Sequence, residues 1–347
     1  MRQLRRRELN RTAVADVLTS LESDTTPGIS SAADAALRGA LRIATARVCE
    51  QRGLDAPPTT QLVVAMGRLG GHELGYSSDA DVMFVHDPHP DVEPAAAQTF
   101  ALAVAQQVRS LLGETGPEPS LEVDAALRPE GRNGPLTRSF AAYTEYYGRW
   151  SSIWERQALL RARPVAGDDA LGERFTALID PLRYAGGLDD SQVRELRRIK
   201  ARVESERMPR GVPANRHLKL GRGGITDVEW TVQLVQLLHA HDVPGLRTTR
   251  TLEALDVAVA AGLVTPEDGS VLRAAWRLAV RARDAIVLAT GRTSGARIDV
   301  LPSERRELGH VAQLLGYGPD AGGVFEEDYL RTARRARGVV ERVFFGE

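Results

Sequence analysis

The sequence predicts an α+β protein in which a small α/β unit lies between two helical regions. Three observations predict it: helical apolar spacing near the start, short apolar runs bounded by glycine and proline between about residues 55 and 165, and helical spacing from about residue 137 onward. At roughly 100–200 residues per domain, the 347 residues suggest two or three domains. We place them at 1–54, 55–165 and 166–347.

Two helices are predicted first, over residues 1–22 and 32–52. In the first, Leu4, Leu9, Val14, Val17 and Leu18 fall roughly on one side of the helix. A polar break with glycine and proline, residues 23–31, separates the two helices. A second break, Gly53 to Thr60, contains Pro57 and Pro58 and predicts a linker into the α/β unit.

Three strands and one helix make up the predicted α/β unit. The strands are residues 61–66, 79–86 and 120–127, and a glycine-rich loop, 67–78, joins the first two. The helix begins at Pro94 and runs to about Leu112, before Gly113. Its predicted core face is Phe100, Val104, Val108 and Leu111.

Helices fill the rest of the chain in this interpretation. Thr265-Pro266-Glu267 is a typical helix start, and that helix is expected to reach about Gly291. Further helices are predicted from Ser303 and over 325–345. A helix is also predicted to start at Thr226, where Thr226 and Glu229 have capping-box spacing.

Composition excludes several classes of protein. The 45 basic and 46 acidic residues nearly cancel, which argues against a sequence-independent nucleic-acid binder. Cys49 is the only cysteine, so we expect no internal disulfide and a cytoplasmic setting. No signal peptide is evident, and no apolar run reaches the roughly 20 residues that span a bilayer.

The chemistry is expected at Asp79 and Asp81, at the head of the second predicted strand. Side chains alternate along a strand, so these two carboxylates share a face. Their mutual repulsion is tolerated when a cation lies between them, and Mg²⁺ prefers carboxylate and phosphate oxygens. A pair of this kind can also simply start a strand.

Asp124 supplies a third carboxylate on another predicted strand. Three carboxylates on neighbouring strands can hold two metal ions for an in-line displacement at phosphorus. The glycines before Asp79, Gly67, Gly70 and Gly71, let backbone N–H groups approach phosphates, and Ser77 and Ser78 add hydroxyl donors. The ordered combination predicts phosphoryl or nucleotidyl transfer.

Four long motifs resemble the glutamine synthetase adenylyltransferase family, whose catalytic domains belong to the DNA polymerase β-like nucleotidyltransferase superfamily. They are GRLGGHELGYSSDADVMFVHD (67–87), EVDAALRPEGRNGPL (122–136), WERQALLRARPVAGD (154–168) and KLGRGGITDVEWTVQLVQL (219–237). The resemblance covers nearly the whole chain. The residues of the first motif are similar to those of the C-terminal, adenylylating half of that two-part family. We therefore expect this chain to correspond to that half.

The resemblance implies a polymerase β-like nucleotidyltransferase unit followed by a mainly helical bundle. It implies that Asp79, Asp81 and Asp124 hold Mg²⁺, with two ions, and that ATP is the nucleotide. Asp124 would take the proton of a glutamine synthetase tyrosine, which receives AMP as pyrophosphate leaves, and nitrogen metabolism would be regulated in this way. Alternatives are phosphorolytic deadenylylation, nucleotide transfer to a PII signal protein, and a catalytically inactive nucleotide-binding module.

Other polar residues have two interpretations each. Arg128 follows the third strand and either binds phosphate or is structural. Lys219, beside Gly223 and Gly224, is a candidate phosphate contact. Asp227, Glu229, Arg161 and Arg163 either line the nucleotide site or serve the helices that carry them. His86, Asp87, His89 and Asp91 favour a solvated loop over a metal cluster, because prolines interrupt them.

Overall fold

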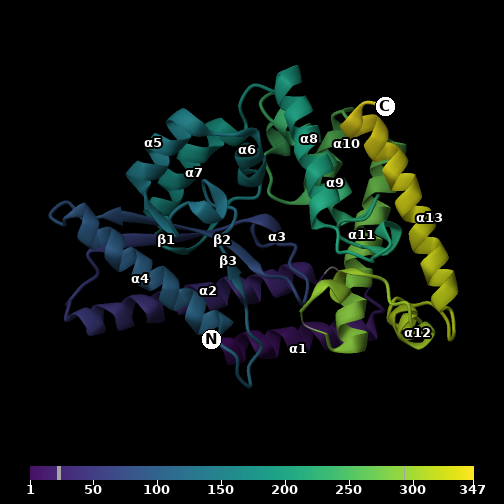
Figure 1. The fold of residues 1–347 in the computed structure, drawn as a ribbon, viewed down its shortest axis with the longest axis horizontal. Helices are drawn as coiled ribbons and strands as arrows, with labels where there is room; N and C mark the ends of the chain where they lie inside the picture. Colours follow the sequence, from purple (N-terminus) through teal and green to yellow (C-terminus); the bar gives the residue numbers. More distant parts are fainter. Residues whose placement is uncertain (22–24, 293) are drawn as a thin grey trace. The chain divides into compact units, whose positions relative to one another are not determined.

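The computed structural model describes residues 1–21, 25–292 and 294–347 (Figure 1). It contains two compact units, each built from separate segments. Unit 1 comprises Met1–Asn10, Thr26–Leu74 and Ser78–Ala185, and unit 2 comprises Arg11–Thr25, Gly75–Ser77 and Gly186–Glu347. The predicted ranges 1–54, 55–165 and 166–347 group the chain differently and stay a prediction about domains.

Unit 1 contains a small mixed sheet. Its strands are β1 (Thr59–Ala65), β2 (Ala80–Pro88), β3 (Val123–Asp124), β4 (Thr137–Ser139) and β5 (Arg163–Gly167). The strands lie in the order β3-β2-β1-β5. Strand β4 is outside this order and also pairs with β2. Strand β1 is antiparallel to β2 and β5, whereas β3 and β4 run parallel to β2. The central strands β1 and β2 are apolar runs, as expected for strands buried on both faces.

Helices cover both faces of this sheet (Figure 1). On one face lie α2 (Thr26–Arg52) and α4 (Pro94–Gly113), and on the other α5 (Phe140–Trp150) and α7 (Asp169–Arg183), with α6 (Ile153–Leu159) beside α7. Phe100, Val104 and Val108 of α4 are fully buried, as predicted. On the opposite face Met83 and Val85 of β2 pack with Tyr143 and Phe175. The sheet is therefore rigidly enclosed along most of its length.

Several predicted boundaries in unit 1 were wrong. Strands β4 and β5 were expected to be helical or loop; β5 contains Pro164 and ends at Gly167, so only its pairing with β1 makes it a strand. The third strand is two residues long instead of spanning 120–127. Helix α2 begins at Thr26, inside the predicted break. The end of the first predicted helix at residue 22 and the start of that break at residue 23 lie outside the described residues.

Unit 2 is helical, apart from an isolated bridge between His217 and Val300. Its longer helices are α8 (Asp190–Arg207), α9 (Ile225–His239), α10 (Thr251–Ala260), α11 (Pro266–Thr290), α12 (Arg305–Leu314) and α13 (Gly322–Val340). Helix α11 packs against α9, α12 and α13. Its ends confirm the prediction: the Thr265 hydroxyl accepts from Asp268 N–H, and Gly291 closes it at φ +66°.

Two predicted helix starts and one predicted face need correction. Gly224 is the N-cap of α9, and the Thr226 hydroxyl donates to the Lys219 carbonyl, so Thr226 and Glu229 form no capping box. Helix α12 begins at Arg305, after Glu304, two residues beyond Ser303. The first helix, α1 (Arg2–Leu18), carries its apolar side chains exposed, with Leu18 at 79%. Of the helices described, none has the length and apolarity needed to cross a membrane.

Candidate active site

Asp81 and Asp124 lie side by side at the edge of the sheet. Strands β2 and β3 are parallel, and their register pairs Ala80 with Val123 and Asp81 with Asp124. Residues paired in register present their side chains on the same face of a sheet. A contact between residues 43 positions apart in the sequence thus brings two like charges together, which costs free energy unless a cation or donors offset it.

Asp79 immediately precedes β2 and is exposed to solvent. Asp81, two residues later, is half-buried within the strand. The alternation of a strand places Asp81 on the same face as Met83 and Val85, the face that α5 and α7 cover. The carboxylates therefore lie at the end of the sheet where the apolar cover stops.

Gly67 forms the floor beneath Asp81. It stands at φ +50°, in the left-handed region, directly after β1. A Cβ added at this position would overlap with Oδ2 of Asp81. Only glycine allows the chain to turn this close to the carboxylate, so the glycine-rich loop is shaped around Asp81.

Asp124 is held by its own loop. Its Oδ1 accepts a hydrogen bond from the Ala126 N–H at 2.7 Å. Its Oδ2 lies 3.9 Å from the guanidinium of Arg132, whose side chain is 83% exposed. The side chain of Asp124 is itself 34% exposed. One oxygen is thus fixed, and the other is available to a reacting group, with a mobile cation at hand.

Gly70 and Gly71 have roles other than free N–H donors. Gly70 ends a short helix, α3 (Gly67–Gly70), and Gly71 is its C-cap; Gly70 N–H donates to Met66 O at 2.8 Å and Gly71 N–H to Gly67 O at 3.2 Å. A Cβ on Gly70 would overlap with the Arg161 carbonyl. The expectation that Gly70 and Gly71 leave their N–H groups unoccupied is therefore wrong. A contact between either glycine and a nucleotide remains a prediction.

Ser77 and Ser78 fall in different units although they are adjacent. In unit 2, the Ser77 hydroxyl donates to the Arg292 carbonyl at 3.5 Å. Ser78 is half-buried in unit 1, one residue before Asp79. Their predicted contact with phosphate stays a prediction.

Arg128 organises the loop after β3. Its guanidinium donates to the carbonyls of Ala125 at 2.6 Å, Arg132 at 3.1 Å and Gly134 at 2.9 Å. Burial lowers the pKa of Arg128 from its ordinary value. These contacts support the structural interpretation, and its predicted phosphate role is left with little donor capacity.

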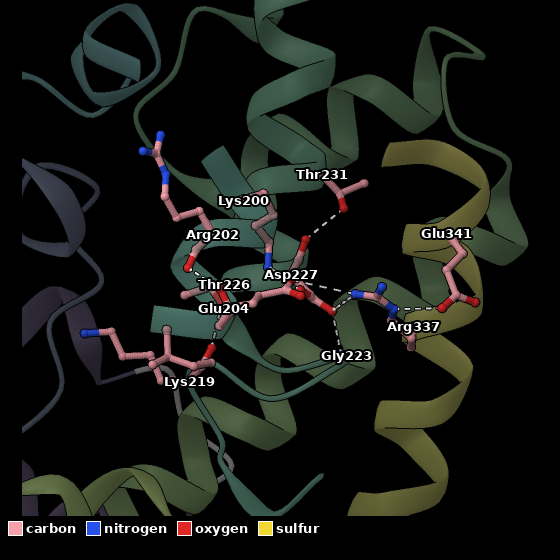
Figure 2. Close-up of polar contacts among 12 residues, drawn as sticks. Lys200, Arg202, Glu204, Lys219, Gly223, Thr226, Asp227, Thr231, Arg337 and Glu341 are labelled. Carbon is pink, nitrogen blue, oxygen red and sulfur yellow. Dashed lines mark hydrogen bonds and ion pairs between the residues drawn. The ribbon is translucent and has the colours of Figure 1, made fainter. Parts of the chain in front are cut away.

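Lys219 is exposed in unit 2, and Figure 2 shows its side chain pointing away from Asp227. Asp227 is fully buried, and its carboxylate contacts Lys200 at 2.5 Å, Arg337 at 3.3 Å and the Gly223 N–H at 2.7 Å. Burial alone would raise the pKa of Asp227, but these cations and the N–H lower it. Asp227 is thus a structural ion-pair residue, and Lys219 stays a candidate phosphate contact.

Arg161 and Arg163 are also engaged in unit 1. Arg161 is buried against Glu73 at 2.5 Å, and Arg163 pairs with Asp34 at 3.0 Å. Arg161 therefore ties the turn after α6 to the glycine-rich loop, and Arg163 of β5 ties α2 to the same loop by also donating to the Leu69 and Gly70 carbonyls. Glu229 is half-buried on α9, and nothing in its surroundings decides between its two interpretations.

The histidine-containing segment is a loop only in its second half, where His89 and Asp91 are exposed after the end of β2, as expected. His86 and Asp87 belong to β2. His86 is buried beside Thr137, and Asp87 pairs with Arg174 at 2.6 Å. His89 lies 3.3 Å from the Thr60 hydroxyl. Strand pairing therefore decides the conformation of His86 and Asp87, and the expected loop begins after Pro88.

The carboxylates suit a divalent cation in the kind of donor they offer. Asp81 and Asp124 are oxygen donors on paired strand positions, above a glycine whose missing side chain leaves room for them. Their side chains as they stand are not gathered into a ligand set: no group of three acidic, histidine or cysteine side chains in the described ranges is close enough to hold a metal ion. The fit therefore rests on the paired backbone positions of two aspartates.

Two residues that lie close to the aspartates in the sequence escaped prediction. Arg132 lies in the loop RPEGRNGP directly after the third aspartate, which was a usable signal. Tyr76 precedes Asp79 by three residues, but its partners come from positions far away in the sequence, so no local pattern marked them.

Comparison with known proteins gives two family matches. Residues 1–178, just over half of the chain, match the family described as glutamate-ammonia ligase adenylyltransferase. Residues 192–344 match a second family, described as GlnD PII-uridylyltransferase. The first match contains all three aspartates of the candidate site, and the second lies within unit 2.

The curated relatives carry one name, bifunctional glutamine synthetase adenylyltransferase/adenylyl-removing enzyme. That of Mycobacterium avium (strain 104) is 52% identical over 99% of this chain and 34% of its own length. That of Streptomyces avermitilis is 51% identical over 100% of this chain and 35% of its own length. That of Nocardia farcinica is 50% identical over 99% of this chain and 34% of its own length. This chain spans about a third of the length of the curated relatives it matches.

The two kinds of comparison agree with the geometry. The family match covers the sheet, the Gly67 turn and the paired aspartates, and the relatives align with both units. The chain belongs to the glutamate-ammonia ligase adenylyltransferase family.

Proposed function

We propose that this chain transfers AMP from ATP to a tyrosine of glutamine synthetase, with release of pyrophosphate. The observation that carries the proposal is the pairing of Asp81 with Asp124 on parallel strands beside the Gly67 turn. The name of the relatives supports the substrate, and the motif around Asp79 resembles the adenylylating half of the family. A polymerase β-like catalytic unit and a regulatory role in nitrogen metabolism belong to the same proposal.

Asp79, Asp81 and Asp124 would hold the divalent cations, with Mg²⁺ favoured because all the side-chain donors are oxygens. When bound, a Mg²⁺ pair supplies charge neutralisation on the triphosphate and favours the ionised form of an attacking hydroxyl. Asp79 is exposed and Asp81 is half-buried within the strand, and both would supply carboxylate oxygens to the ions.

Asp124 would act as the proton acceptor. Its Oδ1 is held by the Ala126 N–H, so Oδ2, which lies 3.9 Å from the exposed Arg132, is the atom that would take the proton. The tyrosine oxygen forms a bond to the α-phosphorus, its proton passes to Oδ2, and the bond from the α-phosphorus to the pyrophosphate oxygen breaks. Arg132, near Oδ2, would offset negative charge as the phosphates rearrange.

The test uses the chain, Mg²⁺, α-labelled ATP and unmodified glutamine synthetase. Asp81→Asn and Asp124→Asn are expected to lower transfer of label by about a hundredfold or more. Asp87→Asn is the matched control, because Asp87 is an aspartate on the same strand that pairs with Arg174 away from the site. Equal transfer by Asp81→Asn and Asp87→Asn would sink the proposal.

Other outcomes would point to the alternatives. ATP binding without transfer, combined with release of ADP from adenylylated glutamine synthetase in phosphate, would indicate the adenylyl-removing reaction. Failure to bind ATP with Mg²⁺ would indicate an inactive module.

A second candidate function rests on the match of residues 192–344 to the PII-uridylyltransferase family. It predicts transfer of UMP from UTP to a PII protein, and the same assay with labelled UTP and PII decides it. Labelling of PII, but not of glutamine synthetase, would replace the first proposal with this one.

A further inference from the structure

The segment Gly75–Ser77 belongs to unit 2, although the chain on both sides of it belongs to unit 1. It lies within the motif that leads to the candidate site, and Ser77 is two residues from Asp79. Three residues cannot form a core of their own, so contacts within the helical unit must hold them in place. Those contacts come from α1 and α11.

Tyr76 is anchored through its side chain. Its hydroxyl donates to Oδ2 of Asp16, which is fully buried on α1. The Thr25 hydroxyl contacts the same carboxylate at 2.9 Å. A tyrosine hydroxyl bonded to a buried carboxylate is a strong, directional contact. Burial, followed by the bond to Asp16, raises the pKa of Tyr76 far above its ordinary value, so the hydroxyl keeps its proton.

The backbone of the segment is held by α11. The Tyr76 N–H donates to Oδ1 of Asp284 at 3.3 Å, and the Ser77 carbonyl accepts from Arg283 at 3.4 Å. Asp284 and Arg283 are both buried. A Cβ on Gly75 would overlap with Oδ1 of Asp284, so glycine is what allows the segment to lie against the helix.

We propose that Asp16, Tyr76 and Asp284 are positioning residues: by holding Gly75–Ser77, they restrain the stretch of backbone that leads to Asp79 in the sequence. The proposal rests on the proposed function, since it gives Asp79 a role in the reaction. Asp79 lies outside β2, so strand pairing does not fix it as it fixes Asp81. The anchor at Tyr76 adds a restraint on the backbone three residues before Asp79.

The test compares Tyr76→Phe with Tyr317→Phe in the full chain. Tyr317 also donates to a carboxylate in unit 2, Asp328, at 2.6 Å, but it lies far along the sequence from Gly75–Ser77. Two measurements are made: amide hydrogen exchange of peptides covering 75–81, and kcat and KM for AMP transfer. Gly75→Ala is the second variant, since it displaces the segment from Asp284 without removing any polar group.

Tyr76→Phe and Gly75→Ala are each expected to speed exchange in 75–81 by about tenfold, the scale of one lost charge-assisted hydrogen bond. We expect kcat to fall by about the same factor, with KM for ATP changed less than about twofold. Tyr317→Phe is expected to leave both unchanged. A change in thermal stability alone, with exchange in 75–81 equal in all the variants, would overturn the proposal.

Failure of the proposed function gives a different pattern. If the unmodified chain transfers no AMP to glutamine synthetase, the exchange measurement still decides whether Tyr76 restrains 75–81. Faster exchange in Tyr76→Phe then supports the anchoring in an enzyme of other specificity, and unchanged exchange overturns it.

Discussion

At the scale of single residues, Gly67 is the position on which the carboxylate geometry depends most directly. Its φ of +50° costs an alanine about 1 kcal/mol or more, and a Cβ would in addition displace the Asp81 carboxylate. Most glycines in loops can be replaced at the cost of backbone strain alone. Here the side chain that would be displaced is a candidate ligand.

We expect Gly67→Ala to lower the unfolding free energy by about 1–3 kcal/mol and AMP transfer by more than tenfold. Urea denaturation and the labelled-ATP assay measure the two effects. Gly148→Ala is the control: Gly148 is an exposed residue of α5 with no heavy atom near its added Cβ, and it should gain up to about 1 kcal/mol. Full activity in Gly67→Ala would show that Asp81 need not hold its present position.

The acidic residues of the candidate site could be named from the sequence. The roles of the residues beside them could not be predicted in the same way. Asp79, Asp81 and Asp124 stand out because charge in or beside apolar runs has few structural explanations. Arg128 was left with two interpretations, because an arginine's donors can be used by its own loop and the sequence RPEGRNGP does not show which carbonyls accept them. Local sequence records residue type, whereas hydrogen-bond partners depend on the folded backbone.

At the scale of elements, three helices of unit 2 meet at one buried carboxylate. Lys200 comes from α8, Asp227 from α9 and Arg337 from α13 (Figure 2). Lys200 also pairs with Glu204, and Arg337 with Glu341 at 2.9 Å. Because every member has a partner of opposite charge, the cluster fixes how these helices pack.

We expect Lys200→Met to lower the unfolding free energy by about 3 kcal/mol, since removing one partner of a buried pair leaves an uncompensated charge. Arg149→Ala removes a cation from an exposed pair with Glu145, and it should change stability by less than about 0.5 kcal/mol. Chemical denaturation of both variants measures the difference. A cost for Lys200→Met no larger than that for Arg149→Ala would contradict a structural role for the cluster.

Elements whose start and stop signals are local in the sequence were predicted well. Strands that form only by pairing with another strand were not. Helix α11 has a threonine cap, a proline in its first turn and a left-handed glycine at its end, all local in the sequence. Strand β5 has no such signals, because its arginine, proline and glycine become a strand only beside β1. Strand β3 was overextended for the opposite reason: an apolar run continued past the two residues that pair.

At the scale of the whole molecule, acid stability depends on buried neutral histidine. His86 lies in β2 with its Nδ1 3.2 Å from the Thr137 hydroxyl of β4. Burial lowers the pKa of His86 to about 4, although Asp87 acts in the opposite direction. The unfolded chain takes up this proton near pH 6.5, so between about pH 6.5 and 4 it binds more protons than the folded chain.

The unfolding free energy should therefore fall as pH drops through that window, with His86 contributing about 2 kcal/mol between pH 7 and 4.5. His86→Gln should lose this share of the pH dependence, because glutamine takes up no proton. The exposed His241→Gln serves as control and should follow the unmodified chain. Identical slopes for His86→Gln and the unmodified chain in denaturation at the two pH values would refute the assignment.

The general class of the molecule, helices around a small α/β unit, could be predicted because periodicity and glycine content change along the chain. The grouping into units could not, since it depends on residues such as Tyr76 that pack with partners some 60 and 208 positions away. From the sequence alone, residues that are neighbours along the chain are assigned to the same unit. Gly75–Ser77 shows that three residues can leave one unit for the other and return.

The passage of the chain from one unit to the other and back has a consequence for synthesis on the ribosome. Tyr76 emerges long before α11, and unit 2 needs Arg11–Thr25, Gly75–Ser77 and Gly186–Glu347 together. Neither the helical body nor the anchoring of Gly75–Ser77 can be completed until Asp284 has left the exit tunnel. The nascent chain can therefore form the sheet first, and Gly75–Ser77 is held in place only after α11 has been synthesised.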